Sequence, residues 1–156
     1  MLDTLITGAR VIDGTGAPGR PCDVGILDDR IVHVGTSPHH EAAVTVDAGG
    51  LLLTPGFMDP HSHTDWSVLG NPEAHSTIRQ GVTTEVVGNC GVTYAPLHDA
   101  DVPAAQSSLA SLGYTEQITW RSFGELLDTV HGGGTTQNLM WFVGHTVGGE
   151  GAHRDH

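Results

Sequence analysis

The chain has 156 residues, enough for one ordinary domain, and it carries 18 acidic residues against 6 basic ones. The net charge of −12 argues against binding to nucleic acid or to an anionic membrane, because both need clustered positive charge. No apolar run approaches the roughly 20 residues of a membrane span, and the first residues do not resemble a secretory signal. Two cysteines make no disulfide framework, so we expect a cytoplasmic protein.

The first part of the chain is predicted to be a small β unit. Short β-branched apolar stretches alternate here with turn-rich and polar segments. Two of these stretches flank the acidic pair Asp28-Asp29, which predicts a hairpin. A polar loop is expected at 37–42. The strands are expected at 2–13, 23–27, 30–34 and 44–46.

The pattern changes near Leu51, where an α/β organisation begins. The apolar run 51–54 predicts a buried strand of a parallel sheet that continues toward His63. Asn71 and Pro72 are typical of a helix start and Gly81 of a helix stop, so we expect a helix over 71–80. The strand, helix and strand so formed favour a parallel sheet. Later elements are expected as a strand at 82–87, helices near 104–112 and 123–131, and a strand at 139–143.

A His-Ser-His segment is the strongest local signal of chemistry. Side chains alternate along a strand, so His61 and His63 are expected to share a face, together with Asp59 and Asp65. Two imidazoles so placed suit one divalent ion, with a carboxylate as a further ligand or as an orienting group. A pair of solvated or core histidines is the alternative. The position after an apolar strand favours a site, because α/β enzymes place sites at the carboxyl ends of strands.

Two further candidates follow the next strands. Cys90, in Gly-Asn-Cys-Gly, suits a metal ligand, although a buried structural cysteine is the alternative. His145 is a candidate for contact with substrate or metal, or a loop histidine. Glu85 receives no role. The other histidines are expected to be solvated or structural.

These residues together resemble a known family. The stretch PGFMDPHSHTDWSVLGNPEAHSTIRQGVTTEVVGNCGVTYAP, 55–96, is similar to the N-terminal part of amidohydrolase-superfamily enzymes. Within that superfamily, IRQGVTTEVVGNCG resembles the N-acyl-D-amino-acid deacylases. The segment LITGARVIDGTG…DVGILDDRIVHVG resembles the small β domain that precedes the barrel in these enzymes. A weaker similarity, F-x-E-L-L…N-L-x-x-x-V-G-H, extends to about His145.

The resemblance implies a fold, a metal and a reaction. It implies that 1–54 is part of a small β domain and that 55–156 holds the first three βα units of a TIM-like barrel, since a closed barrel needs about 250 residues. His61, His63 and Cys90 would bind one or two Zn²⁺ ions, and His145 would bind substrate. The acid/base aspartate would lie beyond residue 156, so this fragment alone is expected to be inactive.

The implied enzyme is a hydrolase of linear amide bonds other than peptide bonds. It would convert N-acyl-D-amino acids, as small-molecule substrates, to D-amino acid and carboxylate. A cyclic-amide hydrolase, similar to hydantoinases or dihydroorotases, is one alternative, against which Cys90 counts. A catalytically silent truncated polypeptide is another.

Overall fold

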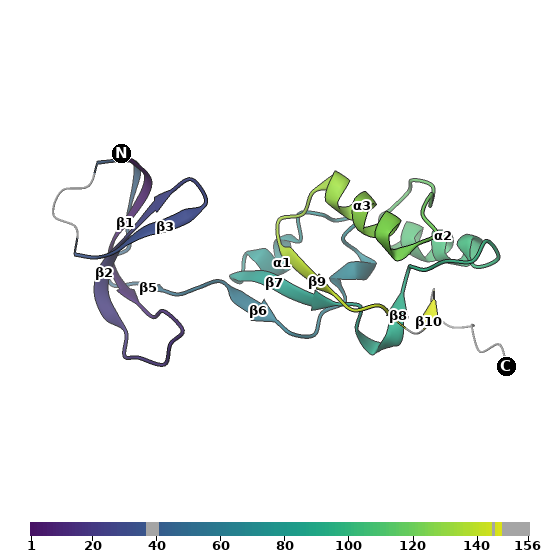
Figure 1. The fold of residues 1–156 in the computed structure, drawn as a ribbon, viewed down its shortest axis with the longest axis horizontal. Helices are drawn as coiled ribbons and strands as arrows, with labels where there is room; N and C mark the ends of the chain where they lie inside the picture. Colours follow the sequence, from purple (N-terminus) through teal and green to yellow (C-terminus); the bar gives the residue numbers. More distant parts are fainter. Residues whose placement is uncertain (37–40, 145, 148–156) are drawn as a thin grey trace. The chain divides into compact units, whose positions relative to one another are not determined.

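The computed structural model describes residues 1–36, 41–144 and 146–147. The chain divides into two compact units, Met1–Pro55 and Gly56–His156. Each unit has β-sheet of its own, and the helices belong to the second unit (Figure 1). Within the described ranges, no helix is long and apolar enough to cross a membrane.

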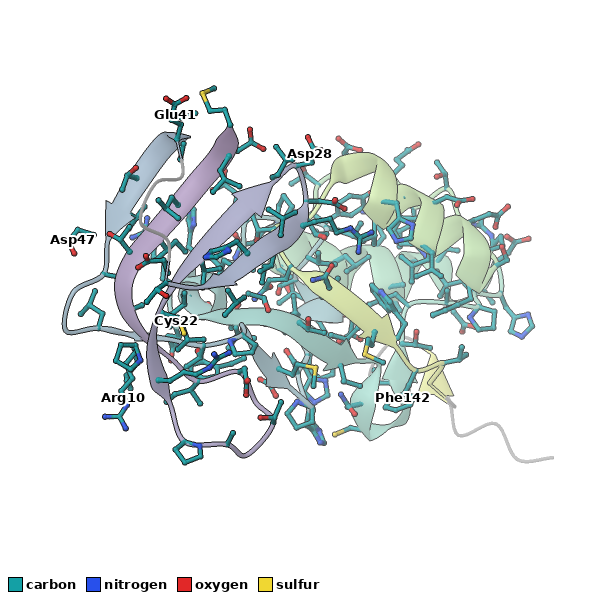
Figure 2. All side chains as sticks on the ribbon, turned by 60° about the vertical axis from the view of Figure 1, so that its left-hand side comes forward. Arg10, Cys22, Asp28, Glu41, Asp47 and Phe142 are labelled. Carbon is teal, nitrogen blue, oxygen red and sulfur yellow. The ribbon has the colours of Figure 1, made fainter. Side chains whose placement is uncertain are left out.

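The first unit is a five-stranded mixed sheet. Its strand order is β3-β2-β1-β4, and β5 also pairs with β1. The β1–β2 and β2–β3 pairs are antiparallel, whereas β4 and β5 run parallel to β1. Cys22 is buried in this sheet, whereas Asp47 projects away from it (Figure 2). The strands are β1 (Leu2–Val11), β2 (Arg20–Leu27), β3 (Arg30–Gly35), β4 (Ala42–Asp47) and β5 (Leu52–Leu53).

The predicted hairpin is confirmed as the β2–β3 pair. Asp28 occupies its turn (Figure 2) with a φ of 54°, a left-handed conformation that aspartate tolerates better than most residues. Its backbone N–H donates to Asp3 Oδ2 at 2.6 Å, which ties the turn to β1. The predicted strand at 44–46 is confirmed as β4. Most of the predicted 37–42 loop lies outside the described residues.

The prediction for the apolar run 51–54 is wrong. Its residues Leu52 and Leu53 form β5, which pairs with β1 in the first sheet, and the Leu51 and Leu52 side chains are exposed. Pro55 has no N–H to donate, so the chain leaves that sheet there. The strand that leads into the His-Ser-His segment is the shorter β6 (Phe57–Asp59).

The second unit is built on a parallel three-stranded sheet. Its order is β6-β7-β9, with α1 between β6 and β7 in the chain, so the predicted strand–helix–strand organisation is confirmed (Figure 1). A separate short parallel pair joins β8 to β10. The elements are β7 (Val82–Val87), β8 (Val92–Thr93), β9 (Asn138–Trp141), β10 (Thr146–Val147), α1 (His75–Ile78), α2 (Val102–Ser111), α3 (Phe123–Gly133), and the 3₁₀ turns η1 (Thr64–Trp66) and η2 (Asn89–Gly91).

The helix expected over 71–80 is present only as its last part. Ala74 is left-handed, with a φ of 41°, so the chain turns before α1 begins. The Glu73 carboxylate instead lies 2.6 Å from His75 Nε2, and both side chains are exposed. Gly81 ends the segment with a φ of 86°, as predicted. Asn71 and Pro72 therefore belong to a turn and not to the first turn of a helix.

The core of the second unit includes the buried faces of α2 and α3. Trp120 is 1% exposed and packs in one cluster with Leu109 of α2 and Leu126 of α3. Its indole N–H donates to the Tyr94 carbonyl at 2.8 Å, so the one polar atom of this large side chain is satisfied. The helices expected near 104–112 and 123–131 and the strand expected at 139–143 are confirmed as α2, α3 and β9.

A capping box begins α3 and gives a stability prediction. The Ser122 hydroxyl accepts the Glu125 N–H at 3.3 Å, and Glu125 Oε2 accepts the Ser122 N–H at 2.8 Å. Ser122→Ala should therefore lower the free energy of unfolding by about 1 kcal/mol. Urea denaturation measures this loss. Ser107→Ala, on the exposed side of α2, is the matched control and should change it by less than about 0.5 kcal/mol; equal losses would contradict the prediction.

Candidate metal centre

His61 and His63 lie in the segment that follows β6, and not on the strand itself. The strand prediction fails here because pairing with β7 stops at the Asp59–Glu85 position, after which Pro60 has no N–H for the ladder. The Asp59 carboxylate accepts the His61 N–H at 3.0 Å and so stabilises the turn that follows β6. The two imidazole rings still lie close together, with centroids 5.6 Å apart.

Cys90 follows β7 in a tight turn with unusual backbone geometry. The residue has a φ of 59° and lies in η2. Gly88 and Gly91 on either side have φ values of 79° and 75°. A Cβ at position 88 would overlap the Phe142 carbonyl, so the backbone after β9 approaches this turn too closely for a side chain. Left-handed backbone at a residue other than glycine costs roughly 1–3 kcal/mol and is concentrated at functional sites.

The three side chains converge on one point. Cys90 Sγ lies 3.5 Å from His61 Nε2 and 3.5 Å from His63 Nε2, and the three donor atoms lie within 4.8 Å of one another. In a tetrahedral zinc site, bonds of roughly 2.0 Å to nitrogen and 2.3 Å to sulfur separate the two atoms by about 3.5 Å. The donor set therefore fits a zinc ion. Among the described residues, no second cluster of three such ligands occurs.

The His63 ring is held by Trp66. The two ring centroids are 4.3 Å apart and the planes are inclined by 34°. His63 Nδ1 is buried and has no hydrogen-bond partner among the described residues, and the same is true of Trp66 Nε1. The stacked indole therefore fixes the plane of the imidazole while its Nε2 faces Cys90.

Asp65 lies beside this site but does not join the ligand cluster. It is 5% exposed, and neither carboxylate oxygen has a hydrogen-bond partner in the described part of the chain. Burial raises the pKa of Asp65 to about 6. The N–H of Gly88, which lies near without a well-formed hydrogen bond, and the His63 ring act more weakly in the opposite direction.

Glu85 is the residue that sequence reasoning missed. It is fully buried in β7, where its Oε2 accepts from the Ser62 hydroxyl at 2.9 Å and its Oε1 accepts from Gln137 Nε2 at 3.0 Å. The signal was a single acid inside the β-branched stretch 82–87, where burial of a carboxylate requires dedicated partners. Those partners come from segments distant in the sequence.

His145, the predicted substrate contact, lies outside the described residues. The preceding Gly144 is described, and a Cβ there would lie 2.7 Å from the Gly91 carbonyl and 2.8 Å from the backbone of Val92. The chain that follows β9 therefore runs against the turn that carries Cys90. The prediction for His145 itself stays a prediction.

Comparison with known proteins gives consistent matches. The sequence model of the amidohydrolase family matches residues 44–137. N-acyl-D-aspartate deacylase from Alcaligenes xylosoxydans xylosoxydans is 38% identical over 145 residues, which are 93% of this chain and 28% of that relative.

Solved structures agree with the sequence matches. A structure of D-aminoacylase, studied for the functional role of its binuclear metal center, gives a TM-score of 0.79 at 38% identity and covers 93% of this chain and 30% of that one. N-acyl-D-glutamate deacylase from Bordetella bronchiseptica, in complex with zinc and a phosphonate inhibitor, gives a TM-score of 0.79 at 39% identity over 92% and 30% of the two chains. The chain thus spans less than a third of the length of these relatives.

The buried Asp65 predicts a pH dependence of stability in the metal-free chain. Because its pKa is about 6 in the folded state and 3.8 in the reference state, the folded chain binds the proton more tightly. The resulting stability is fully present below about pH 4 and is lost as pH rises through 6. One pKa unit corresponds to about 1.4 kcal/mol, so the loss is at most about 3 kcal/mol.

Urea denaturation between pH 4 and 7, with a chelator present, measures this dependence. Asp65→Asn keeps the side-chain shape and removes the titration, so its stability relative to the unmodified chain should rise across that range. Parallel stability curves for the two proteins would contradict the prediction.

Proposed function

The chain belongs to the amidohydrolase family, as its motifs predicted, and from this premise we propose that the protein is a metal-dependent hydrolase of amide carbon–nitrogen bonds. One observation carries the proposal. His61, His63 and Cys90 meet at the carboxyl ends of β6 and β7, with nitrogen–sulfur distances of 3.5 Å that suit zinc. This is the place where parallel α/β folds bind substrates and cofactors.

We assign the three residues to one or two zinc ions. When bound, zinc supplies a Lewis acid that polarises a carbonyl and makes water more acidic. His61 and His63 offer their Nε2 atoms, and Cys90 offers a soft sulfur donor of the kind that zinc accepts. The Trp66 ring packs against the His63 imidazole and fixes the orientation of its ring plane. We assign no proton-transfer role to a residue of this chain.

We infer N-acyl-D-amino acids as the substrate class. The relatives named above are an N-acyl-D-aspartate deacylase, a D-aminoacylase and an N-acyl-D-glutamate deacylase, so a linear amide on a D-amino acid is the chemistry they share. The net charge of −12 agrees with a small-molecule substrate and not with nucleic acid. No observation favours the cyclic-amide alternative.

Three finer assignments are also proposals. We take 1–54 as part of a small β domain and 55–156 as the start of a barrel, and the two compact units, which divide at Pro55, support that proposal. We keep His145 as a substrate contact. We place the protein in the cytoplasm, with support from the free thiols of Cys22 and Cys90.

Metal binding tests the assignment of the ligands. The 156-residue chain should bind zinc, and His61→Ala combined with Cys90→Ala should weaken that binding more than about 100-fold, because direct ligands matter more than the groups that orient them. Competition with a chromophoric chelator measures the affinity. The matched control is His98→Ala, an exposed histidine outside the cluster, which should leave the affinity unchanged. Zinc binding that survives the double substitution would refute the assignment.

A chimera tests the activity, since the chain spans 28% of N-acyl-D-aspartate deacylase. The matched residues of this chain replace their counterparts in that enzyme. The zinc-loaded chimera should release D-aspartate from N-acetyl-D-aspartate and should not act on the L-enantiomer. Cys90→Ala in the chimera should lower kcat/KM by more than about 100-fold. A folded, zinc-loaded chimera without turnover would contradict the proposed activity.

A further inference from the structure

We propose that Ser62 and Glu85 are positioning residues that fix the three donor atoms in binding geometry before a metal ion arrives. The inference rests on the proposed metal centre and adds to it two residues that are not ligands. It is drawn from a set of hydrogen bonds that runs from the interior of the sheet to the segment between the two histidines.

All three polar groups of Ser62 are bonded to the segment that leads to Cys90. Its N–H donates to the Val86 carbonyl at 2.9 Å. Its hydroxyl donates to Glu85 Oε2 at 2.9 Å, and its carbonyl accepts from Asn89 Nδ2 at 3.1 Å. The residue between the two histidines is therefore attached at every polar group that it has.

Glu85 is the buried and rigid end of this set of hydrogen bonds. It is 0% exposed and lies in the middle strand of the sheet, opposite Asp59 of β6 and Leu139 of β9. Its second oxygen is held by Gln137 Nε2, which also donates to Thr77 Oγ1 at 2.6 Å. A buried carboxylate held on both oxygens has little freedom to move, so its bond to Ser62 transmits the rigidity of the sheet.

Asn89 extends the same support to the thiol. Its side-chain amide donates to the Val86 carbonyl at 2.7 Å as well as to the Ser62 carbonyl. Because Asn89 directly precedes Cys90, one amide group joins the histidine segment to the cysteine turn. The positions of the sulfur and of the two imidazoles are thus fixed relative to the same backbone atoms.

This arrangement explains how a segment without strand pairing holds two ligands in register. β6 ends at Asp59, where its register with β7 stops, so the His-Ser-His segment that follows lacks the regular ladder hydrogen bonds of a strand. Ser62 replaces them with the contacts described above. Groups that orient metal ligands typically change metal affinity by roughly 10–100-fold when they are removed.

The experiment measures affinity for Co²⁺, a coloured ion that accepts the same nitrogen and sulfur donors. In the 156-residue chain, Ser62→Ala removes the donor to Glu85 together with the acceptor of the Thr64 N–H, and it leaves every ligand in place. It should weaken Co²⁺ binding by roughly 10–100-fold and alter the ligand-field spectrum of the bound ion. Ser62→Thr, which keeps the hydroxyl, should restore both. Glu85→Gln keeps the side-chain shape and should weaken binding less than Ser62→Ala, and it provides the test if Ser62→Ala does not fold.

Ser108→Ala is the matched control, because it removes a half-buried serine hydroxyl that bonds the Tyr94 hydroxyl and none of the residues of the site. It should lower the unfolding temperature while the affinity for Co²⁺ and the spectrum stay unchanged. If both variants lose affinity in proportion to their loss of stability, the role is structural and the inference is overturned. Unchanged affinity in Ser62→Ala and Glu85→Gln overturns it as well. Failure of the unmodified chain to bind Co²⁺ refutes the metal centre itself and this inference with it.

Discussion

Parallel pairing between β6 and β7 places two carboxyl ends side by side, and the convergence of the three metal-binding side chains follows from that contact. It brings His61 and His63, which follow one strand, within 3.5 Å of Cys90, which follows the next. In an antiparallel pair, the carboxyl ends of the two strands would instead lie at opposite ends of the sheet along the strand direction. The short α1 crossover is what makes the parallel arrangement possible over so few residues.

Around that contact the chain accepts several locally unfavourable features. Cys90 is left-handed, Asp65 is buried with no hydrogen-bond partner among the described residues, and Glu85 is buried in the middle of a sheet. The Trp120 cluster beneath α2 and α3 supplies apolar burial that offsets such costs. Glu85 differs from Asp65 in that both of its oxygens are satisfied. The unsatisfied Asp65 therefore titrates abnormally, with a pKa of about 6.

Local chemistry explains what could be predicted from the sequence. The β2–β3 hairpin, β7 and α3 follow from turn residues, β-branching and helical spacing, all of which are properties of neighbouring residues. The convergence of Cys90 with the two histidines followed from strand order. The run at Leu52 was misassigned because an apolar stretch does not reveal which of two sheets it joins. In the structure this run pairs with β1. Glu85 was missed because its partners Ser62 and Gln137 are 23 and 52 residues away.

The three donors are contained in a single crossover, since Cys90 is only 29 residues from His61. Ser62, Glu85 and Asn89 lie inside the same interval, and Gln137 is the support that, among the described residues named above, comes from outside it. A gene rearrangement that keeps this interval intact would carry the donors and nearly all of their supports together. The site is in this sense local in the sequence, because one continuous segment carries all three donors and most of the groups that hold them.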